Sequence, residues 1–349
     1  MRALIVIALV GCKGSPPRAA SRADYCQGQT PIEPAPALGT QTGSSVRPVN
    51  TFSIVARDPA TGDLGVAVQS HWFSVGSIVT WAEPGVGAIA TQAFAEPGYG
   101  PKGLALMRDG VAAPEAMAKL VAADKQGDVR QLGFIDAQGR VASHTGAKCI
   151  AYAASHVGAN YAVQANIMAN AKVVPAIAHA FETTAGDLTD KLLAGLDAGQ
   201  AAGGDLRGCQ SAAILVVSGK RGDEPWKEKK LDLRVEDSAA PLVELRRLVG
   251  LARAYDQMNQ GDAAVESKDI KSAAEHYAAA ARMQPNNMEM VFWSAATLAA
   301  QGQYDTTLPM WKKVFADDPR WIEMTKRLVA PGLLDRATAD RVLRDAQSR

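Results

Sequence analysis

One segment of the sequence allows few folds, and it runs from Thr51 to Ser70 as TFSIVARDPATGDLGVAVQS. Two stretches rich in β-branched and apolar residues flank DPATGD, where Pro59 and Gly62 suit a tight reversal of the chain. This pattern predicts two antiparallel strands joined by a turn. We therefore expect a folded domain that contains β-sheet to begin at Thr51.

The start of the chain carries a signal for export. It reads MRALIVIALVGC, a positive residue followed by an apolar run that is too short to cross a bilayer as a helix. The ending LVGC resembles the lipobox of bacterial lipoproteins, in which cleavage leaves a cysteine that carries lipid. We expect residues 1–11 to be a lipoprotein signal peptide and Cys12 to be the lipidation site. The alternative is an ordinary secretory signal.

The next segment, residues 12–50, is expected to be a disordered tether that starts at the lipidated Cys12. Residues 13–50 hold six prolines with Gly, Ser and Thr between them and almost no apolar periodicity. Lys13, in the position where Asp would favour the inner membrane, favours the outer membrane by the same resemblance. We expect a lipid-anchored protein of the cell envelope that faces the periplasm.

The charge balance excludes partners that bind through a strong overall field. The 37 Lys and Arg residues against 36 Asp and Glu residues leave a net charge of +1. We therefore expect no nucleic-acid partner, and membrane contact only through the lipid anchor. No H-E-x-x-H or C-x-x-C spacing occurs, so no metal and no cofactor are predicted. Cys149 and Cys209 are expected to be buried, and a disulfide between them is the alternative.

Beyond Ser70, strand and helix patterns occur in groups. Four strands, including segments near Gly76–Trp81 and Gly87–Ala93, precede two helices, in YGPKGLALMRDG and in EAMAKLVAAD with Pro114 in its first turn. A hairpin about Asp136–Gly139, helices near 172–183 and 188–201, and the strands QSAAILVVS and KKLDLRVED follow. This grouping favours layered sheets with helices outside over a strictly alternating parallel sheet.

After Pro241 only helical patterns remain. Pro285 and Pro319 lie thirty-four residues apart, which is the tetratricopeptide period, and each follows a helix pattern that contains an aromatic residue, Tyr277 or Trp311. The segment GQYD falls where such a repeat turns between its helices. We expect residues 238–349 to form a tetratricopeptide-like helical domain, and the alternative is a plain helical cap on the main domain.

Longer motifs carry a resemblance to a known family. TFSIVARDPATGDLGVAVQS, SHTGAKC, YAVQANIM and GQAAGGDLRGCQSAAILVV, in this order, resemble the bacterial and archaeal family called domain of unknown function 1028, from Thr51 to about Leu248. That family is assigned to the N-terminal nucleophile hydrolase superfamily. The resemblance implies a four-layer αββα fold over residues 51–237 and leaves the reaction open.

In that superfamily the first residue of the first strand is Thr, Ser or Cys, and its own free α-amine is the base. A threonine hydroxyl is a poor nucleophile at neutral pH, whereas a terminal amine with a pKa of about 7.7–8.0 can take its proton. The resemblance implies this role for Thr51, which requires cleavage after Asn50. The alternative is a β-branched residue that merely starts a strand.

Supporting residues are assigned by position and by the resembling motifs. Ser70 and His71 end the second strand beside Thr51 and are candidates to orient the amine or the substrate, while Thr91 and Gln92 are candidates to hold an oxyanion. The resembling motifs add five substrate-binding candidates, which are His144, Gln164, Asn166, Asp205 and Gln210. For each of the five, the alternative is a structural hydrogen bond.

Two functions from different classes follow. The first is an exported lipoprotein hydrolase of amide bonds, which uses an N-terminal threonine and acts on a peptide, an acylated amine or a cell-wall fragment. The second is a catalytically silent, lipid-anchored binding or scaffold protein, whose helical repeats bind peptidoglycan or an envelope protein.

Overall fold

The computed structural model describes residues 51–348 of the chain. The expected signal peptide, the lipid on Cys12 and the tether over residues 12–50 lie outside the described residues. The chain divides into two compact units between Leu242 and Val243, whereas the sequence places the boundary after Asp237.

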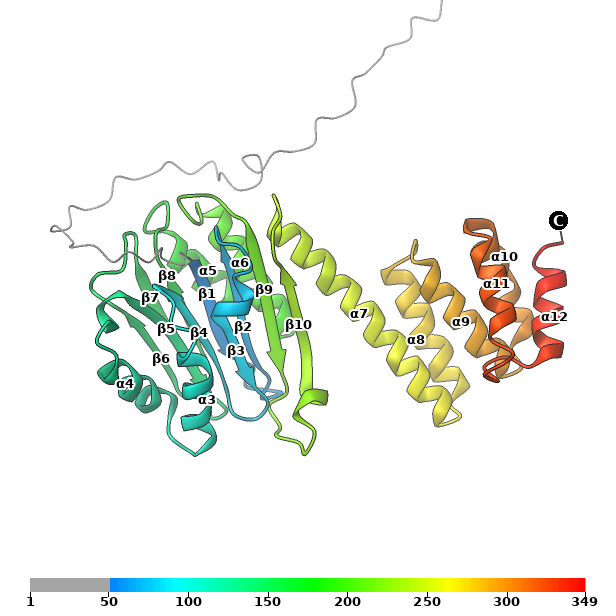
Figure 1. Ribbon diagram of the computed structural model, residues 1–349, viewed down its shortest axis with the longest axis horizontal. Coiled ribbons are helices and arrows are strands. Elements are labelled where there is room, and N and C mark those ends of the chain that lie inside the picture. The colour runs from blue at the N-terminus through cyan, green and yellow to red at the C-terminus, as the bar shows by residue number, and fades with distance from the viewer. Residues whose placement is uncertain (1–50, 349) are drawn as a thin grey trace, which may run out of the picture. The chain divides into compact units, whose positions relative to one another are not determined.

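The first unit contains a six-stranded antiparallel sheet in the order β10-β9-β2-β1-β8-β7 (Figure 1). The predicted hairpin is confirmed as its centre, because β1 pairs with β2 in the register that sets Thr51 opposite Ser70. The hairpin of β7 and β8 was not anticipated and turns at Asn160, which adopts a φ of 63°. The strands are β1 (Thr51–Arg57), β2 (Leu64–Ser70), β7 (Ala154–Gly158), β8 (Tyr161–Ala165), β9 (Ser211–Val217) and β10 (Lys229–Val235).

A four-stranded antiparallel sheet, in the order β3-β4-β5-β6, faces the first. The hairpin predicted about Asp136–Gly139 is confirmed, with Gly139 at a φ of 79°. The strand expected near Gly76–Trp81 is wrong in its first half, where Gly76–Val79 forms the short helix α2. The Ser77 hydroxyl donates to the Ser74 carbonyl at 2.7 Å, a local bond that favours a turn over an extended chain. The strands are β3 (Thr80–Glu83), β4 (Gly87–Ala93), β5 (Arg130–Asp136) and β6 (Val141–Thr145).

Helices cover the outer face of each sheet, which gives the first unit four layers (Figure 1). Helices α3 (Tyr99–Arg108) and α4 (Ala113–Ala123) pack on the four-stranded sheet, and α5 (Val173–Thr183) and α6 (Leu188–Ala201) pack on the six-stranded sheet. Short 3₁₀ turns lie at Gly127–Val129 and Pro225–Glu228. The layered arrangement expected from the grouping of elements is therefore confirmed.

Alternation along the strands divides side chains between the two faces of each sheet. In β1, Val55 belongs to the buried apolar cluster between the sheets, whereas Phe52 and Ile54 face α6. Leu64, Val66 and Val68 of β2 join the same inter-sheet cluster. Side chains at Thr51 and Ser53 therefore point, like Val55, toward the facing sheet.

The second unit is helical throughout its described part. It consists of α7 (Pro241–Glu266), α8 (Ile270–Met283), α9 (Met288–Ala300), α10 (Tyr304–Asp317), α11 (Arg320–Arg327) and α12 (Arg336–Asp345). Pro285 and Pro319 follow the ends of α8 and α10, and Tyr277 and Trp311 are buried. Over residues 51–348, no helix combines the length and apolar character that a membrane span requires.

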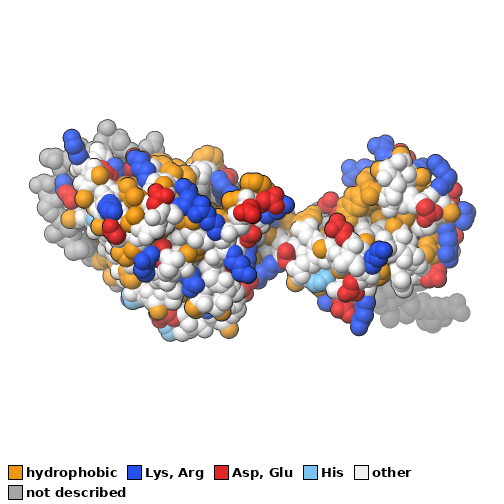
Figure 2. All heavy atoms as spheres, turned by 90° about the horizontal axis from the view of Figure 1, so that it is seen from below, with side chains coloured by type: hydrophobic (Ala, Val, Ile, Leu, Met, Phe, Trp, Pro, Cys, Tyr) orange, Lys and Arg blue, Asp and Glu red, His pale blue; other side chains and the backbone are white. Residues whose placement is uncertain are grey.

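The surface carries charges of both signs. On the face shown in Figure 2, Lys and Arg side chains are interspersed with Asp and Glu side chains over both units. This agrees with the net charge of +1 for the whole chain.

Candidate functional site

Thr51 is the first residue of β1, and its side chain is completely buried. Its hydroxyl donates to Oγ of Ser70, 3.2 Å away on the neighbouring strand. The two side chains meet because directly opposed residues in an antiparallel pair project from the same face of the sheet. Two hydroxyl groups are thus in contact at the end of the β1–β2 pair.

Both sheets hold the backbone of Thr51 in place. Its carbonyl accepts hydrogen bonds from Nε2 of Gln92, at 3.1 Å, and from the backbone N–H of Asn166, also at 3.1 Å. Gln92 comes from β4 of the facing sheet, and Asn166 directly follows β8. The position of Thr51 is therefore fixed from the facing sheet and from a neighbouring strand.

A buried network of amide side chains lies between the sheets beside Thr51. Ser53 donates to Oε1 of Gln92 at 2.6 Å, and Gln164 donates to Oγ of Ser53 at 2.9 Å. Oε1 of Gln131 accepts from Gln92 at 2.7 Å and from Asn166 at 2.8 Å. Each of these side chains is at most 1% exposed. Buried amides that satisfy one another in this way form a rigid support.

A second set of hydrogen-bonded polar residues lies next to Ser70. The backbone N–H of His71 donates to Oδ2 of Asp205 at 3.2 Å, and Arg207 binds that carboxylate through Nη2 at 2.7 Å and Nε at 3.1 Å. The backbone N–H of Gln210 donates to the carbonyl of Ser70 at 2.9 Å. Within the described residues, Nδ1 of His71 is buried and has no hydrogen-bond partner.

Two candidates from the sequence lie on the outer face of their sheet and are not brought to Thr51. The Thr91 hydroxyl donates to the Glu96 carbonyl at 3.2 Å, on the side of β4 that Ile89 presents to the α3–α4 cluster. His144 contacts the Gly127 carbonyl at 2.9 Å through Nε2. Both side chains point away from the inter-sheet space because neighbouring strand residues alternate between faces.

The structure thus brings together Thr51, Ser70, Gln92, Gln164 and Asn166, and it places His71, Asp205 and Gln210 along the adjoining edge. It also adds residues that were not singled out, which are Ser53, Gln131 and Arg207. Ser53 was accessible to reasoning, since it lies two residues from Thr51 on one strand. Gln131 required the β4–β5 register, in which it pairs with Gln92.

The two cysteines within residues 51–348 differ in whether they form a disulfide. Cys149 is a free, buried thiol, and burial raises its pKa to about 11. Cys209 is also buried but is disulfide-bonded, so the pairing of Cys149 with Cys209 does not occur. Among residues 51–348, no group of three or more His, Cys, Asp or Glu side chains is arranged to hold a metal ion.

Comparisons with known proteins place the first unit in a family. A solved structure, protein SPO2555 from Silicibacter pomeroyi, is described as a DUF1028 protein; it is 29% identical and superposes with a TM-score of 0.52. The match covers 57% of this chain and 84% of that one. No curated protein matches the sequence. The model of the family of unknown function called DUF1028 matches residues 51–245, more than half of the chain, and the chain therefore belongs to this family.

Proposed function

We propose that the protein is an exported lipoprotein hydrolase of amide bonds, with the N-terminal nucleophile fold in its first unit and Thr51 as nucleophile. The observation that carries this proposal is the placement of Thr51. It is the first residue of a central strand, its hydroxyl contacts Ser70 at 3.2 Å, and its carbonyl is held by two N–H groups. The proposed substrate is a peptide, an acylated amine or a cell-wall fragment.

The reaction needs a free α-amine on Thr51. That amine takes the proton of Oγ1 as the oxygen attacks the substrate carbonyl, and it returns the proton to the leaving amine when the amide C–N bond breaks. Water then hydrolyses the Thr51 ester and regenerates the hydroxyl. Nε2 of Gln92 is engaged with the Thr51 carbonyl and with Oε1 of Gln131, so we assign Gln92 the role of a positioning residue.

The free amine would arise by self-cleavage. The Thr51 hydroxyl attacks the carbonyl of Asn50, and an N-to-O shift converts the peptide bond into an ester. Water hydrolyses this ester, which leaves a carboxylate on Asn50 and an amine on Thr51. The same cut breaks the peptide chain between the first unit and the lipid proposed on Cys12 in the outer membrane.

The test is intact mass and N-terminal sequencing of the full chain from its native envelope. Samples are reduced before the mass is measured, because Cys209 is disulfide-bonded. The parent and Thr51→Ser should begin at residue 51, and Thr51→Ala should stay uncut. Thr61→Ala, in the exposed β1–β2 turn, is the matched control and should be cut. A parent chain that stays uncut and lipidated at Cys12 would overturn the mechanism.

A second candidate is a catalytically silent scaffold that binds peptidoglycan or an envelope protein through a tetratricopeptide-like second unit. It is favoured by the helical pairing of that unit, in which Tyr277 and Trp311, thirty-four residues apart, are both buried. Deletion of residues 241–349 should then abolish sedimentation with purified peptidoglycan or capture of the envelope protein. Unchanged binding after the deletion would remove this candidate.

A further inference from the structure

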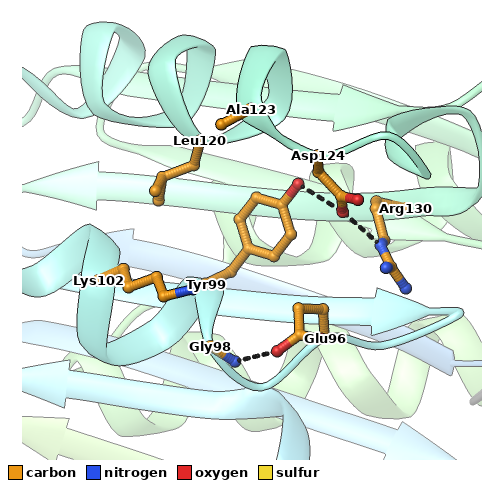
Figure 3. Close-up of a pocket in the computed structure, with 8 residues that line it drawn as sticks. All are labelled: Glu96, Gly98, Tyr99, Lys102, Leu120, Ala123, Asp124 and Arg130. Atoms are coloured by element: carbon orange, nitrogen blue, oxygen red, sulfur yellow. Dashed lines mark hydrogen bonds and ion pairs between the residues drawn. The ribbon is translucent and has the colours of Figure 1, made fainter.

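A cavity of about 240 Å³ lies on the outer side of the four-stranded sheet, where α3 and α4 meet the end of β5 (Figure 3). It adjoins the Thr51 end of the unit, since Arg130 pairs with Ala93, the residue after Gln92. The cavity is lined by Glu96, Gly98, Tyr99, Lys102, Leu120, Ala123, Asp124 and Arg130. No step proposed for Thr51 uses this cavity.

One wall of the cavity is preorganised and electrically balanced. The Tyr99 hydroxyl donates to Oδ2 of Asp124 at 3.0 Å, and Nε of Arg130 donates to the same oxygen at 2.7 Å (Figure 3). Arg130 also donates to the Phe94 carbonyl and to Gln126. Burial opposes ionisation of Asp124, but its hydrogen bonds outweigh burial and lower its pKa. Asp124 and Arg130 thus neutralise each other.

Two charges at the cavity remain without an ion pair. Neither Glu96 nor Lys102 has a salt-bridge partner among the described residues; Oε1 of Glu96 accepts only the Gly98 backbone N–H, at 2.9 Å. A Cβ atom added at Gly98 would lie 2.8 Å from Oε1 of Glu96 and 3.5 Å from Nζ of Lys102. The Glu96 carboxylate and the Lys102 ammonium therefore both lie close to Gly98, on the side to which a Cβ atom would project.

This arrangement selects the charge pattern of a ligand. A cation alone would meet Lys102, and an anion alone would meet Glu96, so each would gain one attraction and one repulsion. An α-amino acid carries an ammonium and a carboxylate on one carbon and can pair with both side chains at once. The volume of 240 Å³ suits a molecule of this size, and Leu120 and Ala123 provide apolar contact for its side chain.

We propose that this cavity binds a free α-amino acid, with its ammonium at Glu96 and its carboxylate at Lys102. The Cα of the ligand would occupy the space beside Gly98. The proposal does not depend on hydrolysis at Thr51.

The test is isothermal titration of the full chain with each common L-α-amino acid in turn. At least one should bind, and its affinity should fall at least about tenfold in Glu96→Gln and in Lys102→Met, because each variant loses a charge-assisted hydrogen bond. The N-acetyl and carboxamide derivatives of that amino acid, which each lack one charge, should lose affinity to the same degree.

Three further variants make the test specific. Gly98→Ala keeps a backbone φ of −58° that alanine adopts without strain, but its methyl group would lie 2.8 Å from Oε1 of Glu96 and displace that carboxylate, so it should also weaken binding. Lys125→Met, an exposed lysine beside Asp124, should bind as the parent does. Thr51→Ala should also retain binding, which separates this site from the proposed nucleophile. No binding by any amino acid, or an affinity equal to the parent's in Glu96→Gln or in Lys102→Met, would overturn the proposal.

Discussion

At the scale of single residues, the inter-sheet space is divided between apolar and polar side chains. Val55, Val66 and Val68 fill it along the strands, while Ser53, Gln92, Gln131 and Gln164 occupy it next to Thr51. Burying amide groups costs free energy unless each finds a partner, and here they bond to one another and to backbone carbonyls. We infer that this network positions Thr51 rather than providing stability alone.

A prediction at this scale concerns Gly133, which lies against the network. A Cβ atom added there would lie 2.3 Å from Oε1 and 2.5 Å from Nε2 of Gln164, whose side chain is completely buried. Gly133→Ala should therefore lower the free energy of unfolding by about 1–3 kcal/mol, the usual cost of overpacking a core. The measurement is urea unfolding monitored by circular dichroism.

Gly250→Ala is the matched control for Gly133→Ala. The added methyl group meets only Nε2 of Gln284, at 3.9 Å, within helix α7. Because alanine is a better helix former than glycine, this variant should be more stable by about 0.5–1 kcal/mol. If Gly133→Ala unfolds at the same urea concentration as the parent, the network is not rigid.

At the scale of elements, the second unit repeats a turn as well as its helices. Lys268 and Gly302, thirty-four residues apart, precede the starts of α8 and α10 and have φ values of 64° and 80°. Glycine adopts this left-handed conformation freely, whereas a lysine is strained there. The same structural position is thus occupied by a favourable residue in one turn and an unfavourable one in the other.

Substitutions in these two turns should change the free energy of unfolding in opposite directions. Lys268→Gly should raise the free energy of unfolding of the second unit by up to about 1 kcal/mol, because it removes backbone strain. Gly302→Ala should lower it by about 1–2 kcal/mol from strain alone, since no atom lies within 4 Å of the added Cβ. Thermal unfolding followed at 222 nm, the ordinary helix signal, compares both with the parent. Equal melting temperatures for the three would show that these turns do not need the left-handed conformation.

Most elements governed by local sequence were predictable, with one exception. The β1–β2 turn, Pro114 in the first turn of α4 and the turn at Gly302 depend on residues close in the chain, and all lie where expected. The segment Gly76–Val79 was expected to be a strand and is a helical turn instead, because local hydrogen bonds form despite its β-branched neighbours.

Within the site, the contacts that a side chain makes depend on which face of its sheet it occupies and on how its strand pairs with the next. Thr91 and Gln92 are adjacent in a predicted strand, so only one of them could face Thr51, and alternation alone did not decide which. Gln131 reaches Gln92 only after β4 and β5 pair in a particular register. The sequence therefore predicted the position of Thr51 and its strand partner Ser70, but not the amide network behind them.

At the scale of the whole molecule, each unit has apolar cores of its own. One core of the first unit lies between its sheets and another lies under α3 and α4, while those of the second unit centre on Tyr277 and on Trp311. None of these four clusters contains residues from both sides of the division between Leu242 and Val243. Each unit therefore has the apolar packing that independent folding requires.

We expect the two units to fold independently when the chain is divided between Leu242 and Val243. The division falls in the first turn of α7, between the buried Leu242 and the exposed Val243. Fragment 243–349 should be predominantly helical by circular dichroism. The first fragment comprises residues 1–242. Each fragment should melt within about 5 °C of the corresponding transition in the full chain, a shift that corresponds to roughly 1–2 kcal/mol. A disordered fragment 243–349, or a larger loss in either fragment, would show that the units stabilise each other and fold as one.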